Sequence, residues 1–91
     1  MRRRPFGAVA LLSLGFALEH KGDLPAAADR YAEAGGMEGP YTALALLGEA
    51  RCREHAGEKD KARALYERFT REFPQAPEAD VVEAKIGQLA S

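Results

Sequence analysis

Two residues with reactive side chains, Cys52 and His55, lie three positions apart in this chain of 91 residues. On a helix this spacing places both side chains on one face, where a thiolate and an imidazole could form a nucleophilic pair. Such pairs need a third group to orient the imidazole, and the sequence offers none. We therefore favour the alternative, in which Cys52 is a small, semi-buried thiol beside an exposed histidine.

The two histidines of the chain, His20 and His55, lie 35 residues apart. Two imidazoles can share a metal ion, but no cysteine or carboxylate triplet completes a ligand set. Each histidine is expected in the last turn of a helix, where the helix dipole favours a cation. The sequence also lacks motifs for phosphate, dinucleotide or zinc-protease chemistry. We therefore predict a protein that is not an enzyme and has no metal or cofactor.

The composition predicts a single all-helical domain. The chain contains 18 alanines but only three valines, one isoleucine and two threonines, and alanine loses no side-chain entropy in a helix. Thirteen basic and fourteen acidic residues give a net charge of -1, so we expect no basic surface for nucleic acid. A single cysteine excludes an intrachain disulfide.

The N-terminal segment has some features of a secretory signal. Three arginines, Arg2 to Arg4, precede a mainly apolar stretch over residues 6–18. This stretch is shorter than the roughly 20 residues that span a bilayer, and no small-residue cleavage site follows it. Residues 8–12 also recur as residues 43–47. We therefore expect the segment to be part of the folded domain, with no membrane span.

The sequence repeats itself at a spacing of 35 residues. The identical pairs are Pro5/Pro40, Ala8/Ala43, Ala10/Ala45, Leu11/Leu46, Leu12/Leu47, Glu19/Glu54, His20/His55, Gly22/Gly57, Ala27/Ala62 and Tyr31/Tyr66. Each copy is expected to form a helix, a tight turn and a second helix, because Gly22 and Gly57 can adopt the left-handed conformation that ends a helix. Asp23 is expected to cap the second helix, with Pro25 in its first turn.

These elements predict an all-α fold in one domain, residues 1–91. Two helix–turn–helix units, residues 5–39 and 40–74, are followed by a capping helix over residues 77–90. The first helix is expected to begin at Pro5. In the last two helices apolar residues recur on one face, namely Ala62, Leu65, Tyr66, Phe69 and Phe73, then Ala79, Val82, Ile86 and Leu89. The capping helix is needed because an open end of a repeat exposes apolar surface.

The repeat resembles the tetratricopeptide repeat (TPR) family. Five positions after each turn glycine stands a small residue, Ala27 or Ala62, and four positions further an aromatic one, Tyr31 or Tyr66. The resemblance implies that the alanines let two helices approach closely. It also implies that the tyrosines fill the wedge between units, with Gly15 and Ala50 as small residues on the facing helices.

Residues 39–89 further resemble the C-terminal part of bacterial envelope TPR proteins. Examples are the ancillary subunit of the Sec translocon and the Tol–Pal-associated cell-division coordinator. This resemblance implies a periplasmic or envelope-associated location. Glu49 and Arg53 stand where the family usually has apolar residues. We therefore expect the helix over residues 41–56 to be rotated or less buried.

The resemblance implies a binding groove, because the first helices of successive TPR units line a concave surface. The residues expected on this surface are Val9, Leu12, Phe16, His20, Leu44, Leu47, Arg51 and His55. The surface is mainly apolar, and it lacks the lysine and asparagine with which chaperone-binding members clamp a carboxylate. We expect it to bind a protein or peptide partner as a scaffold, unless the C-terminal helix or a second copy covers it.

Self-association without a separate ligand is the alternative function. The first helix carries apolar residues on nearly every side, and no preceding unit covers Val9, Leu12 and Phe16. We expect a homodimer whose contact includes these residues. It would form by stacking of first helices or by exchange of a hairpin across the glycine-rich linker at residues 35–40.

Overall fold

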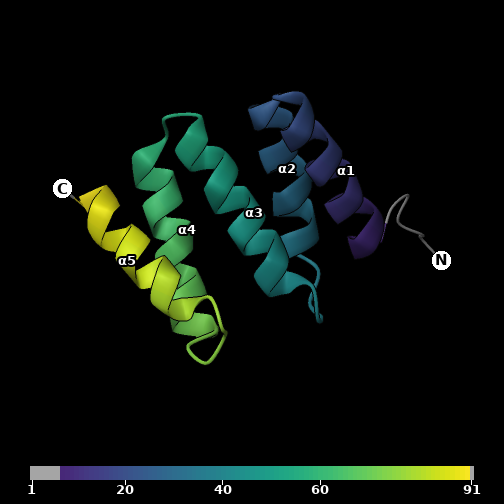
Figure 1. The fold of residues 1–91 in the computed structure, drawn as a ribbon. Coiled ribbons are helices and arrows are strands. Elements are labelled where there is room, and N and C mark those ends of the chain that lie inside the picture. The colour runs from purple at the N-terminus through teal and green to yellow at the C-terminus, as the bar shows by residue number, and fades with distance from the viewer. Residues whose placement is uncertain (1–6, 91) are drawn as a thin grey trace.

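The computed structural model describes residues 7–90, which form five helices in a row (Figure 1). They are α1 (Ala8–Lys21), α2 (Leu24–Gly35), α3 (Thr42–His55), α4 (Lys59–Glu72) and α5 (Ala79–Ala90). The described residues contain no strand. The all-α prediction is therefore confirmed, with two helical hairpins followed by a fifth helix. The expected helix start at Pro5 and the basic residues Arg2 to Arg4 lie outside the described residues.

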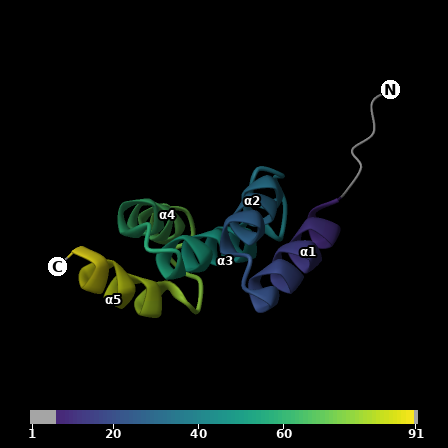
Figure 2. The ribbon, with the colours of Figure 1, turned by 90° about the horizontal axis from the view of Figure 1, so that it is seen from above.

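Each helix packs against the next helix along the chain. Figure 2 shows α2 and α4 along one side of the row and α1, α3 and α5 along the other. The molecule measures 46 × 29 × 18 Å, an elongated shape that is typical of repeats that contact only their neighbours. The architecture is therefore that of an α-solenoid fragment. No helix within residues 7–90 combines the length and apolar character needed to cross a membrane.

The two hairpin turns have the same conformation 35 residues apart. Gly22 and Gly57 adopt left-handed backbone angles, with φ of 94° and 85°. The backbone N–H of each glycine, and of the residue after it, donates to a carbonyl in the preceding helical turn. The Asp23 carboxylate caps α2 by accepting a 3.4 Å hydrogen bond from the Ala26 N–H. The predicted turns and cap are confirmed.

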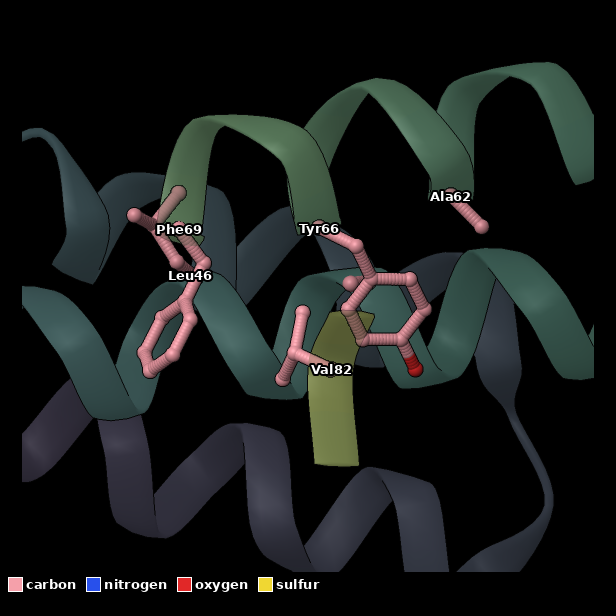
Figure 3. Close-up of a cluster of buried hydrophobic side chains, with 6 residues drawn as sticks. Leu46, Ala62, Tyr66, Phe69 and Val82 are labelled. Carbon is pink, nitrogen blue, oxygen red and sulfur yellow. The ribbon is translucent and has the colours of Figure 1, made fainter. Parts of the chain in front are cut away.

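A buried cluster joins the second hairpin to α5 (Figure 3). Its members are Leu46 and Ala50 of α3, Ala62, Tyr66 and Phe69 of α4, and Val82 of α5. Leu65, Phe73, Ile86 and Leu89 pack against this cluster and are partly buried. The apolar stripes predicted for the last two helices therefore face each other, and they anchor α5 on α4.

Tyr31 fills the space between the two hairpins, as predicted. A Cβ atom built at Gly15 of α1 would lie 3.1 Å from its ring, and one built at Gly48 of α3 would lie 2.7 Å from it. Ala27, one turn earlier in α2, is fully buried. The close approach of α2 to both neighbouring helices therefore depends on small residues, of which Gly48 was not anticipated.

Of the two alternatives for α3, rotated or less buried, the second is wrong. As the central helix it buries more residues than the other helices do within residues 7–90, namely Ala45, Leu46, Gly48, Ala50 and Cys52. Glu49 and Arg53 are half-buried and paired, with Arg53 Nη2 3.4 Å from Glu49 Oε2. Arg53 Nη1 also lies 3.3 Å from Glu58 Oε1. Mutual pairing therefore lets two charged residues occupy positions that are usually apolar, although burial raises the pKa of Glu49.

Candidate functional site

A hollow of about 480 Å³ opens on the side of the row that carries α1, α3 and the residue before α5. Its lining residues are Leu12, Ser13, Phe16, Tyr31, Leu44, Leu47, Arg51 and Glu78. Its exposed lining residues include two large apolar side chains, Phe16 and Leu44, which are 56% and 55% exposed, beside the polar residues Ser13 and Glu78. This hollow therefore offers apolar surface that residues 7–90 leave uncovered.

Two further hollows continue this surface in both directions. One of about 460 Å³ is lined by Phe16, Glu19, His20, Leu24, Arg51 and His55. The other, of about 180 Å³, is lined by Leu47, Arg51, Tyr66, Glu78, Val81, Val82 and Lys85. Because Arg51 lines all three hollows, they form one continuous surface. We call this surface the groove.

The predicted site residues gather in the groove, with one exception. Leu12, Phe16, Leu44, Leu47 and Arg51 line the first hollow, and His20 and His55 join Phe16 and Arg51 in the second. The His20 ring packs on Phe16 with ring centroids 4.8 Å apart. Val9 is 54% exposed but lines none of these hollows.

Sequence reasoning missed the contribution of α5 to the groove. Glu78, Val81 and Lys85 line it, and they lie 34 residues after Leu44, Leu47 and Arg51. α5 thus takes the position of a first helix in a third unit and does more than cover the end of α4. A signal exists in the sequence, because Ala45, Glu49 and Ala50 recur at this spacing. It is weak because alanine is abundant and the spacing differs by one residue from that of the main repeat.

An ion pair inside the groove joins the two hairpins. Arg51 of α3 donates to both carboxylate oxygens of Glu19 of α1, with Nη2 2.9 Å from Oε1. The Tyr31 hydroxyl of α2 also donates to Glu19 Oε1, at 2.8 Å. The hydrogen bonds from Arg51 hold the pKa of Glu19 below its ordinary value, although burial acts in the opposite direction. Burial, together with the bond to Glu19, raises the pKa of Tyr31 to about 12.

The same arrangement recurs one unit further along. Glu54, which corresponds to Glu19, accepts a 3.0 Å hydrogen bond from the Tyr66 hydroxyl. Lys85 of α5 takes the place of Arg51, with Nζ 3.1 Å from Glu54 Oε2. Burial and the bond to Glu54 raise the pKa of the Tyr66 hydroxyl. These carboxylates therefore tie successive units together.

Cys52 is fully buried beside Ala27, Ala28 and Tyr31, not semi-buried as expected. Burial raises the pKa of its thiol to about 11, so the thiol is protonated at neutral pH and is a poor nucleophile. His55, in contrast, is exposed at the groove. Within residues 7–90 no cluster of three histidine, cysteine or acidic side chains could hold a metal ion. The geometry therefore gives no support to a thiolate–imidazole pair.

Comparison with known families agrees with this repeat architecture. The tetratricopeptide repeat family model matches residues 44–76, which extend from α3 through α4 to the loop before α5. This match supports a TPR protein, and TPR repeats generally mediate interactions between proteins. No curated protein and no solved structure matched the chain.

Proposed function

We propose that this chain is a non-catalytic interaction module that binds an apolar segment of a partner protein in the groove. The observation that carries the proposal is the exposure of Phe16 and Leu44 in one hollow. Single exposed apolar residues are common on soluble proteins, but apolar residues gathered in a hollow are typical of binding sites. The match to the TPR family supports the same class of function.

The C-terminal helix leaves the groove open. α5 packs on α4, where Val82 is buried in the shared cluster. The main hollow is lined at this end by the exposed residue Glu78, which directly precedes α5. Of the alternatives considered from the sequence, coverage by the chain's own last helix therefore has no support. An amphipathic helix that presents large apolar side chains to Leu12, Phe16 and Leu47 fits this surface, in the manner of helix-in-groove recognition.

Two synthetic peptides test this proposal. Each has about 18 residues, enough for an amphipathic helix with a leucine ridge, and carries either lysine or glutamate at the remaining positions. We expect at least one peptide to bind the wild-type chain in a calorimetric titration. Phe16→Ala should weaken that binding about tenfold, because removing a central aromatic anchor from an interface commonly costs more than 1 kcal/mol.

Leu14→Ala is the matched control for Phe16→Ala. Leu14 also lies on α1 and is 39% exposed, but it lines none of the hollows of the groove. We expect this variant to bind as the wild type does, with both variants folded by circular dichroism. Failure of both peptides to bind at millimolar concentration, or equal losses in the two variants, would contradict the proposal.

Self-association through α1 is a second candidate, supported by the exposure of Val9, Leu14 and Phe16 on this helix. No other helix of the described chain packs on this outer side of α1, whose neighbours within residues 7–90 are α2 and α3. A second copy would supply apolar contacts for these residues. The homodimer and the partner groove are compatible where the dimer contact uses Val9 and leaves the hollows free.

The bacterial envelope is the cellular setting that we propose for this interaction. It rests on the resemblance of residues 39–89 to envelope TPR proteins, and the family match covers residues 44–76 of this stretch. Fractionation of bacterial cells that carry the native gene tests the setting. Recovery of the protein with cytosolic markers would contradict it.

A further inference from the structure

The cations that line the groove are already paired with carboxylates. Arg51 binds Glu19 through two nitrogen atoms, and Lys85 lies 3.1 Å from Glu54 Oε2. Their positive charges are therefore compensated inside the chain. An incoming acidic segment would have to compete with Glu19 or Glu54 for either cation, and both carboxylates are held in place by a tyrosine hydroxyl as well.

Glu78 differs from these paired carboxylates. It lines both the main hollow and the hollow next to α5, and its side chain is exposed. Across residues 7–90 its carboxylate makes neither an ion pair within 4.0 Å nor a side-chain hydrogen bond. With Arg51 compensated by Glu19 and Lys85 compensated by Glu54, which lies outside the hollows, Glu78 is the charged residue of the groove that has no partner of opposite charge among residues 7–90.

The position of Glu78 in the repeat places this charge at one side of an apolar surface. At the corresponding position α1 has Val9 and α3 has Leu44, whereas the residue directly before α5 is the acidic Glu78. The next position on α5, three residues later, is Val81, which is 70% exposed. A segment bound across the groove therefore meets apolar side chains from α1 and α3 and the carboxylate of the residue before α5.

We propose that the groove selects an apolar segment that carries a basic residue, with the lysine or arginine placed against Glu78. The apolar side chains of this segment lie against Leu12, Phe16 and Leu47. This inference rests on the proposed function, because it names the chemistry of the partner that the groove binds. An exposed ion pair contributes modestly to affinity, so Glu78 acts mainly by discriminating basic from acidic segments.

The two leucine-ridge peptides measure this preference directly. We expect the lysine peptide to bind the wild-type chain about threefold or more tightly than the glutamate peptide at low salt, with a smaller ratio at high salt. Glu78→Gln should reduce the ratio toward one, and Glu78→Lys should reverse it. Glu83→Lys is the matched control, because it changes the net charge equally on an exposed position of α5 outside the hollows.

Each outcome of this experiment decides between the two proposals. A ratio that changes in Glu78→Lys and stays close to the wild-type value in Glu83→Lys supports the inference. Equal binding of both peptides, a preference for the glutamate peptide, or the same change in both variants overturns it and leaves the proposed function standing. Absence of binding by either peptide removes the proposed function together with the inference. Circular dichroism establishes that each variant is folded.

Discussion

Glu19 joins three helices through one carboxylate. It accepts hydrogen bonds from Tyr31 of α2 and from Arg51 of α3, which lie 12 and 32 residues further along the chain. A guanidinium stays protonated throughout the pH range in which proteins are folded, so the strength of this junction depends on the charge of Glu19. Since Arg51 lines all three hollows of the groove, the same carboxylate also fixes the position of a groove residue.

We predict that Glu19→Gln destabilises the chain at pH 7 and flattens its response to acid. The pKa of Glu19 is lower in the folded chain than its ordinary value of 4.5. Its stabilising contribution is therefore complete above pH 4.5 and is lost as the pH falls through the folded-state pKa. Loss of the charged hydrogen bonds should cost about 1–2 kcal/mol at pH 7. That figure allows for solvent screening, because the Arg51 side chain is 40% exposed.

Thermal melts between pH 7 and pH 3 test this prediction. The difference in melting temperature between wild type and Glu19→Gln should shrink as the pH falls. Glu49, whose pKa is raised by burial, contributes equally to both chains and cancels. Glu72→Gln, which removes an exposed pair with Arg68, should change stability by less than about 0.5 kcal/mol. A constant difference across the pH range would contradict the role assigned to Glu19.

At the scale of the elements, the spacing between α2 and α3 is set by a glycine. A Cβ atom at Gly48 would lie 2.7 Å from Cδ1 and Cε1 of Tyr31. The ring has little room to move, because Tyr31 is buried and its hydroxyl is bonded to Glu19. Any side chain at this position must therefore push α3 away from α2.

We predict that Gly48→Ala destabilises the chain by about 1–2 kcal/mol. Replacing glycine by alanine in a helix stabilises it by about 1 kcal/mol. Overpacking of a well-packed contact costs typically 1–3 kcal/mol, and the contact of Tyr31 with Gly48 is of this kind. The net loss should appear as a lower urea midpoint without a change in slope.

Two other helical glycines are internal controls for this substitution. A Cβ atom at Gly15 would lie 3.1 Å from the Tyr31 ring, and one at Gly87 of α5 would meet nothing within 4 Å. We expect Gly87→Ala to stabilise the chain by about 0.5–1 kcal/mol and Gly15→Ala to be nearly neutral. If Gly48→Ala stabilised the chain as much as Gly87→Ala does, this result would contradict the close contact between α2 and α3 at Gly48.

At the scale of the whole molecule, the two ends of the helix row differ in polarity. α1 exposes three large apolar side chains, Val9, Leu14 and Phe16, whereas α5 exposes one, Val81 in the groove, together with Asp80, Glu83 and Gln88. A terminal helix with a polar outer side is typical of the end of a repeat stack, and an apolar one favours a further contact. We therefore expect association at the α1 end.

Sedimentation at micromolar concentration tests this expectation. We predict that the wild-type chain forms a dimer with an interface of at least about 1,000 Å². We also predict that Val9→Asp is a monomer, because an aspartate in an apolar contact loses its hydration. Val9 lines none of the hollows, so this variant should still bind the leucine-ridge peptides. A monomeric wild type would contradict self-association and leave the groove as the remaining candidate.

The local features of this protein follow directly from its amino-acid sequence. The helices, the Gly22 and Gly57 turns and the Asp23 cap depend on periodicity and turn chemistry within a few residues. For the same reason, the groove residues of α1 and α3 could be assigned by transferring one repeat onto the next. The binding role of these residues is a proposal that extends this assignment.

The way in which the helices meet is a property of the folded chain. The Glu19–Arg51 pair, the contact of Tyr31 with Gly48 and the place of α5 beside α3 join residues that local periodicity does not relate. Each depends on the angle and offset between helices, which result from the packing of all their side chains together. Glu78, Val81 and Lys85 continue the groove, but their spacing from the preceding unit differs by one residue from that of the main repeat, so the sequence pattern did not predict this. Their place in the groove results from the packing of α5 on α4.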